Sequence, residues 1–231
     1  MRRISLLSII NKMSGRIFTT HEISLSSGKS LSAVTQSLNN LVREGAVAKI
    51  SRGVWMREGG EAASPYAVIP YLFPRHRAYV SFVTALHIHG IIEQIPQVTE
   101  LASTGHAGTI RTTLGVFYTH HIAPSFFAGF GWHKGGSGFL IAEPEKALID
   151  SLYLSAHKKR RFGHFPELYF PDSFSFKRAR AWVNKINNKT TRAYVLKKLE
   201  DIIDRIEDLK LGHSAREREK GSSSKDYISI K

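Results

Sequence analysis

The sequence predicts an α+β protein in which a small N-terminal domain of helices and a β-hairpin precedes a larger mixed α/β domain that ends in long helices. Three observations carry this prediction. Residues 19–43 hold two helix-start signals separated by turn residues, and residues 47–55 read as two short strands around a glycine. Short strand patterns recur in residues 98–142, and apolar residues at helical spacing dominate residues 144–211.

The first helix of the N-terminal domain is expected over residues 4–10. This apolar run follows the basic residues Arg2 and Arg3, so it superficially resembles a signal peptide. Serines interrupt the run and no small-residue cleavage site follows it, which favours a packed helix. The second helix is expected to start at Thr19, because Thr19 and Glu22 have the spacing of a capping box.

A third helix is predicted from Ser30 to Gly45. Ser26-Ser27-Gly28 is turn chemistry, and the Ser30 hydroxyl can cap the helix that follows. Apolar residues then recur at three- and four-residue steps, which predicts a helix with one buried stripe. The residues of this stripe are Leu31, Val34, Leu38, Leu41 and Val42.

The opposite face of the third helix carries hydroxyl and amide side chains, which are mediocre helix formers. They suit a DNA major groove, where Gln and Asn can pair with adenine and Ser or Thr can serve several bases. Ser32, Gln36 and Asn40 are four residues apart and therefore share one stripe. The side chains expected to face bases or the groove wall are Ser32, Gln36, Asn40 and Arg43.

Two short strands are expected after this helix, with Ser51-Arg52-Gly53 as the tip between them. A tip of this kind can approach phosphates closely, so residues 18–56 together predict a winged helix-turn-helix that binds double-stranded DNA. The alternative is the same fold used only for protein contacts. The expected phosphate contacts are Lys29, Lys49, Arg52 and Arg57.

The charge distribution supports a polyanionic partner. The net charge is +14 and the isoelectric point is about 10.1. Residues 1–60 carry nine basic and three acidic side chains, residues 61–150 carry five and six, and residues 151–231 carry nineteen and ten. A near-neutral middle between two basic ends suggests a globular core with two surfaces that could face nucleic acid.

The composition also bounds the protein class. Cysteine is absent, which excludes disulfides, thiolate chemistry and cysteine-based zinc sites. No segment is apolar enough to cross a membrane, so we expect a cytoplasmic protein. The expected divisions are residues 1–58 for the winged domain, 59–76 for a linker, 77–211 for the C-terminal domain and 212–231 for a disordered basic tail.

Within the larger domain the patterns predict helices at 79–92, 145–156, 173–186 and 190–211, and strands at 98–103, 113–121 and 139–142. The helix at 145 is expected to begin at Pro144, a favourable first helical residue.

No catalytic or metal constellation is predicted. His87 and His89 are two apart on an expected helix, and His120 and His121 are neighbours on an expected strand, so neither pair can readily share an ion. Acidic residues near 143–150 are explained by the start of a helix. Gly135-Gly136-Ser137-Gly138 lacks the spaced carboxylates of a nucleotidyltransferase. We therefore expect no enzyme activity and no cofactor.

A second basic patch is expected in the C-terminal third, where it would contact either DNA phosphates or a protein partner. Its residues are Lys158, Lys159, Arg160, Arg161, Lys177 and Arg178.

Three segments resemble the AbiEi family of antitoxins from type IV toxin–antitoxin and abortive-infection systems. Residues 51–55, Ser-Arg-Gly-Val-Trp, resemble the family's wing, an Arg-Gly followed by an aromatic residue. Residues 81–90 are similar to its Ser-x-x-x-Ala-Leu-x-x-His-Gly helix, and residues 142–150 to its Pro-Glu-(Arg/Lys)-Ala-Leu-x-Asp segment. The match covers most of residues 15–155, and the C-terminal third matches less well.

The resemblance implies a bacterial phage-defence protein with two tasks. Its winged domain would bind inverted repeats in its own promoter and repress transcription, as a monomer or a weak homodimer on DNA. Its C-terminal domain would counteract a nucleotidyltransferase-type toxin encoded beside it. The alternatives are a solitary transcriptional regulator, and an interaction protein whose C-terminal domain binds a toxin or nucleic acid with the winged domain as a docking module.

Overall fold

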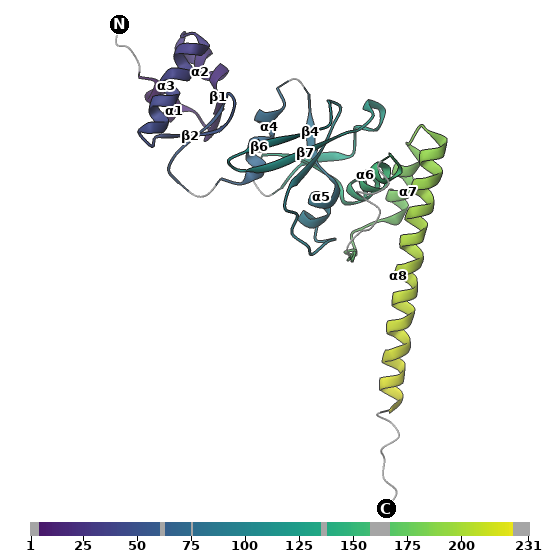
Figure 1. Cartoon of the computed structure of the whole chain (residues 1–231). Helices are drawn as coiled ribbons and strands as arrows, with labels where there is room; N and C mark the ends of the chain where they lie inside the picture. The colour runs from purple at the N-terminus through teal and green to yellow at the C-terminus, as the bar shows by residue number, and fades with distance from the viewer. Residues whose placement is uncertain (1–4, 61–62, 75, 135–137, 158–166, 224–231) are drawn as a thin grey trace, which may run out of the picture. The chain divides into compact units, whose positions relative to one another are not determined.

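The computed structural model describes residues 5–60, 63–74, 76–134, 138–157 and 167–223, with side chains described up to residue 208 (Figure 1). By its internal contacts the chain divides into two units. One comprises residues 1–148 and 166–174, and the other comprises residues 149–165 and 175–231. The protein is α+β, as the sequence predicted: N-terminal helices with a small sheet, then a larger mixed sheet, then C-terminal helices.

The N-terminal region has three helices and an antiparallel three-stranded sheet in the order β1-β3-β2. The predicted helices and the hairpin are confirmed, whereas the three-residue strand β1 was missed because so short a strand has no readable period. The elements are α1 (Leu6–Lys12), β1 (Ile17–Thr19), α2 (Thr20–Ser27), α3 (Leu31–Arg43), β2 (Val47–Ser51) and β3 (Val54–Arg57).

Both predicted helix starts are present. The Thr19 backbone N–H donates to Glu22 Oε2 (2.6 Å), and the Glu22 N–H donates to Thr19 Oγ1 (3.1 Å), which completes the capping box of α2. The Ser30 hydroxyl accepts the Ala33 N–H (3.3 Å) at the start of α3. Gly28, between the two helices, has φ +68°, a conformation that favours glycine. The tight turn therefore fixes where α3 begins.

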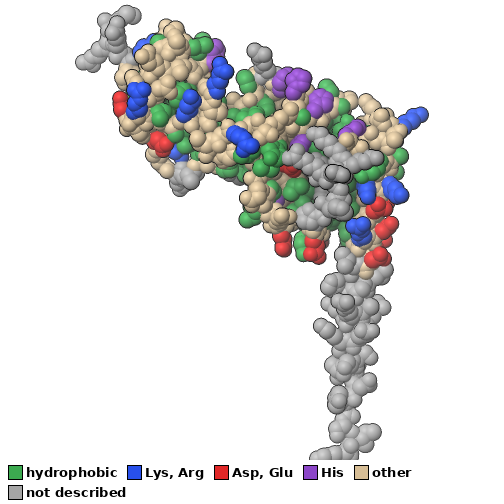
Figure 2. Space-filling model, in the orientation of Figure 1, with side chains coloured by type: hydrophobic (Ala, Val, Ile, Leu, Met, Phe, Trp, Pro, Cys, Tyr) green, Lys and Arg blue, Asp and Glu red, His purple; other side chains and the backbone are tan. Residues whose placement is uncertain are grey.

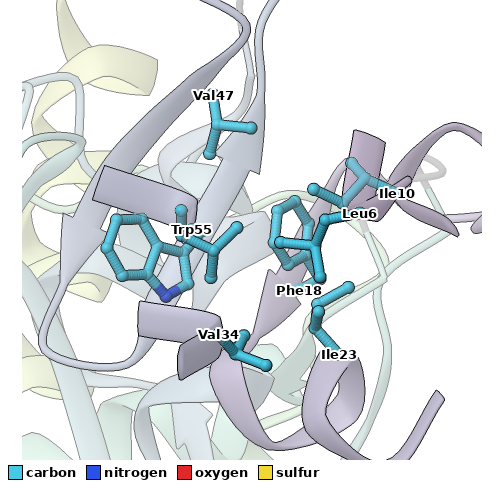
Figure 3. Close-up of a cluster of buried hydrophobic side chains, with 8 residues drawn as sticks. Leu6, Ile10, Phe18, Ile23, Val34, Val47 and Trp55 are labelled. Atoms are coloured by element: carbon cyan, nitrogen blue, oxygen red, sulfur yellow. The ribbon is translucent and has the colours of Figure 1, made fainter. Parts of the chain in front are cut away.

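A hydrophobic cluster holds these elements together (Figure 3). Side chains from α1, α2 and α3 meet Phe18 and Trp55 from the sheet, and the Trp55 indole donates to Thr20 Oγ1 (2.8 Å). The predicted apolar stripe of α3 is only partly buried. Val34 and Leu38 are fully buried, but Leu31 is 52% exposed and Val42 is 37% exposed. Leu31 lies at the first turn of α3, beyond the reach of the cluster.

The second sheet has six strands in the order β6-β7-β5-β4-β9-β8. The pairs β4–β9 and β5–β7 are parallel and the other pairs are antiparallel. Short helical segments accompany it: η1 (Pro65–Val68), α4 (Ile69–Leu72), α5 (Phe82–Ile88) and η2 (Pro124–Phe126). The strands are β4 (Ala78–Val80), β5 (Thr99–Ser103), β6 (Gly108–Thr112), β7 (Gly115–His121), β8 (Phe130–Trp132) and β9 (Leu140–Ala142).

The helix predicted over residues 79–92 is wrong in its first part. Residues 78–80 form strand β4, and the helix α5 starts only at Phe82, whose φ of +56° turns the chain out of the strand. The segment is a short run of aromatic and β-branched residues, a pattern that cannot separate a buried strand from a buried helix. Strands β6 and β8 were missed because both are short and each contains a glycine, so neither shows a readable alternation of apolar and polar residues.

Helix α6 (Pro144–His157) begins at Pro144 as expected, and α7 (Phe176–Asn184) and α8 (Lys189–Ser223) follow it. Arg180 of α7 donates to both carboxylate oxygens of Glu200 of α8 (2.9 and 2.8 Å), and these bonds hold the pKa of Glu200 below its ordinary value. Helix α8 continues twelve residues past the predicted end at Leu211, because residues 213–220 are mostly good helix formers.

The segment expected as a linker, residues 59–76, contains η1 and α4, and its Val68 and Ile69 are buried. In the part of the chain that the structure describes, no helix combines the length and the apolarity that crossing a membrane requires.

Candidate nucleic-acid interface

The exposed face of α3 presents all four side chains that the sequence predicted as base contacts. Ser32, Gln36, Asn40 and Arg43 are exposed, whereas Val34 and Leu38 of the same helix are buried. The cluster below the helix therefore fixes its orientation. Arg43 Nη1 donates to Asn40 Oδ1 (3.2 Å), so these two side chains already lie together at the C-terminal end of the polar stripe.

Two hydroxyls of α3 are engaged by the helix itself. Thr35 Oγ1 donates to the Leu31 carbonyl (2.7 Å), and Ser37 Oγ donates to the Ala33 carbonyl (2.9 Å). Bonds of this kind satisfy a hydroxyl without any external partner. The amides of Gln36 and Asn40 are therefore the best placed groups on this face for reading a base edge.

Arg52 lies exposed in the two-residue turn between β2 and β3. Gly53 beside it has φ +76°, and its carbonyl accepts the Thr20 N–H (3.0 Å), which ties the tip to the start of α2. Lys49, on β2, is exposed and places its ammonium 5.5 Å from the centre of the Trp55 ring. The wing therefore carries two cations on a hairpin that is anchored to the helices.

Lys29 lies exposed immediately before α3. Its carbonyl accepts a hydrogen bond from Ser24 Oγ (2.6 Å), so its backbone is fixed while its side chain extends into solvent. This position lies at the N-terminal end of α3, where the first-turn N–H groups favour an anion.

Arg57 has a different environment from the other predicted phosphate contacts. It is half-buried, and its Nη1 donates to the carbonyls of Ile10 (3.5 Å) and Asn11 (3.3 Å) at the end of α1. These bonds satisfy carbonyls that a helix leaves open at its C-terminus. The structure thus gives Arg57 a stabilising role that sequence patterns did not suggest, and the DNA contacts proposed for the other cations do not depend on it.

Positive charge is spread over the N-terminal region. Figure 2 shows Lys and Arg side chains on this region with few acidic side chains among them. The sequence count agrees, with nine basic and three acidic residues in positions 1–60. The excess of positive charge in this region favours the approach of a polyanion.

The second basic patch is described only in part. Lys177 and Arg178 are exposed in the first turn of α7. Residues 158–161 lie outside the described residues, as do residues 135–137 of the glycine-rich loop. The capping hydroxyl at this helix start is Ser175, which accepts the Arg178 N–H (3.3 Å).

The histidines singled out in the sequence have structural partners. His87 Nδ1 lies 3.1 Å from the Ile92 carbonyl, and His89 Nε2 lies 2.8 Å from the Ala142 carbonyl. His121 Nδ1 lies 3.0 Å from the Gly105 carbonyl. Among the described residues, no group of three or more acidic or histidine side chains could hold a metal ion.

Buried polar residues lie on strands of the six-stranded sheet and at the start of α6, and sequence reasoning did not single them out as a group. His120 Nε2 lies 3.3 Å from Glu100 Oε1, and both residues are buried. Lys146, also buried, donates to the Tyr79 hydroxyl (3.1 Å) and lies 3.9 Å from the centre of the Phe126 ring. The bond between Lys146 and Tyr79 joins the start of α6 to strand β4.

Comparisons with known proteins give no identification. No protein-family model matches this chain, and no curated protein matches it.

Proposed function

We propose that this chain is a sequence-specific DNA-binding repressor of the AbiEi antitoxin type, which binds inverted repeats upstream of its own gene. The observation that carries the proposal is the polar face of α3. Its residues Ser32, Gln36, Asn40 and Arg43 are exposed, and the helix is held by a buried cluster next to the cationic β2–β3 hairpin. An α-helix of this width fits the major groove, and its amides can pair with adenine.

The proposal assigns base contacts and phosphate contacts to different side chains. Base edges would be contacted by the side chains on one stripe of α3, which are Ser32, Gln36, Asn40 and Arg43. Lys29, Lys49 and Arg52 would contact phosphates and set the register of the helix in the groove. Inverted repeats would be occupied by two copies, since the symmetry of the site mirrors that of the protein.

The antitoxin part of the proposal is supported by the resemblance alone. The segments that carry it outside the wing are largely interior. Phe82, Ala85 and Leu86 of the first are fully buried, as are Ala147 and Leu148 of the second. These residues would preserve a fold and would not themselves contact a toxin. Toxin contact would fall to exposed cations such as Lys177 and Arg178.

The proposed function is tested with a reporter gene fused to the DNA upstream of the coding sequence. Expression of the wild-type chain should repress the reporter, and the double variant Q36A/N40A should not, while Ser37→Ala serves as a matched control on the same helix. Equal repression by wild type and Q36A/N40A would contradict the proposal. Coexpression with a neighbouring nucleotidyltransferase gene tests the antitoxin role separately, because Q36A/N40A should still relieve toxicity.

A further inference from the structure

The first turn of α3 exposes an apolar side chain, although the side chains proposed to read bases are all polar. Leu31, the first residue of α3, is 52% exposed. Ser32 beside it is exposed and belongs to the proposed base-reading stripe. Thr35 lies four residues after Leu31 and three after Ser32, so it neighbours both on the helix surface. Its hydroxyl is turned onto the Leu31 carbonyl (2.7 Å).

Exposure alone assigns no role, because single exposed apolar residues are normal on soluble proteins. The position of Leu31 is what distinguishes it. By helical period it belongs to the side of Val34 and Leu38, but it is the first residue of α3, and the N-terminal residues of a recognition helix are the ones that contact base edges. The major groove offers one apolar group at the level of the bases, which is the C5-methyl group of thymine.

We infer that Leu31 contacts the methyl group of a thymine in the major groove and gives the operator a thymine preference at that position. The inference rests on the proposed function, because it takes double-stranded DNA as the partner. Charge favours DNA over a second copy of the chain. A two-fold interface centred on Leu31 would bring the Lys29 side chains of the two copies towards each other, whereas DNA presents phosphates to them.

The test compares two forms of the DNA upstream of the gene, one containing thymine and one containing deoxyuridine throughout. Uracil keeps the base pairing of thymine and lacks only the methyl group. The wild-type chain should bind the deoxyuridine form about fourfold more weakly for each contacted thymine, which is the effect of leaving one methyl group unburied. Single deoxyuridine substitutions then locate the position.

Two variants assign the effect to Leu31. Leu31→Ala should bind both forms of the DNA equally, because it has lost the side chain that meets the methyl group. Leu25→Ala is the matched control: Leu25 is 72% exposed on the neighbouring helix α2, and this variant should keep the wild-type ratio. Alanine preserves helix propensity at both positions, and circular dichroism checks that both variants fold.

Two results would overturn the inference while leaving the proposed function in place. In the first, wild type prefers the upstream fragment to scrambled DNA but binds its thymine and deoxyuridine forms equally. In the second, Leu31→Ala loses as much affinity for the deoxyuridine form as the wild type does. If Leu31→Ala also weakens self-association in sedimentation, Leu31 would be assigned to contact with a second copy of the chain. A wild-type chain with no preference for the upstream fragment would instead overturn the proposed function, and the inference with it.

Discussion

Under the proposed function, Gln36 is the side chain on which base recognition should depend most, because it is exposed in the middle of the polar stripe of α3. Replacing Gln36 with Ala should cost about 1–3 kcal/mol of binding free energy and relax specificity at one base pair. Binding to a set of operators that each carry one changed base pair measures this. Discrimination that is unchanged at every position would show that the Gln36 amide reads no base.

Arg52 should behave differently, because it lies at the tip of the wing and would contact a phosphate. Arg52→Ala should weaken binding to operator and scrambled DNA about equally, and it should reduce the slope of log K against log salt by about one. Arg52→Lys keeps the charge and serves as the control, and its slope of log K against log salt should equal that of the wild type. A variant Arg52→Ala with wild-type affinity and slope would mean that the wing does not touch DNA.

Residue spacing predicted which side chains of α3 are exposed better than it predicted the surroundings of that helix. The exposed positions of Ser32, Gln36, Asn40 and Arg43 followed from helical period, which is a local property. The environment of Arg57 could not be predicted, because its hydrogen bonds to the Ile10 and Asn11 carbonyls join residues 46 and 47 positions apart. Leu31 was expected to be buried, since a periodic pattern cannot show where the underlying core ends.

At the scale of elements, helix starts were the most predictable features and short strands the least. The capping box at Thr19 depends on two side chains three residues apart, so it is visible in the sequence. Strand β4 depends on pairing with β5 and with β9, which lies some sixty residues away in the chain. That pairing overrode a local pattern that equally allowed a helix over residues 79–92.

The capping box gives a stability prediction for α2. Thr19→Ala removes the hydroxyl that accepts the Glu22 N–H, and it should lower the free energy of unfolding of the N-terminal region by about 1 kcal/mol. Hydrogen exchange in residues 20–27 should become correspondingly faster. Thr19→Ser keeps an accepting hydroxyl and should stay close to wild type. If Thr19→Ser is as destabilised as Thr19→Ala, the cap is not the source of the effect.

At the scale of the whole molecule, two basic regions flank a near-neutral stretch of sequence, and the proposed function gives them different partners. Lys177 and Arg178 lie in the C-terminal unit, away in sequence from the winged region. The double variant K177A/R178A should therefore keep the preference for operator over scrambled DNA. It should lose relief of toxicity if this patch contacts a toxin. Coexpression growth assays and binding assays on the same variant distinguish the two uses.

A loss of operator preference in K177A/R178A would instead place part of the specific DNA interface in the C-terminal unit. The division of labour between the two basic regions would then be wrong.

The central claim is that the N-terminal region reads a DNA sequence, beyond the attraction that a net charge of +14 creates by itself. The most direct test is a salt-titrated binding measurement on the DNA upstream of the gene and on scrambled DNA of equal length. We predict tighter binding to the upstream fragment at every salt concentration. The ratio of the affinities for upstream and scrambled DNA should stay above one as salt weakens non-specific binding. Equal and equally salt-dependent binding to both fragments would contradict this claim. It would show that the positive charge of the chain gives only non-specific affinity for polyanions.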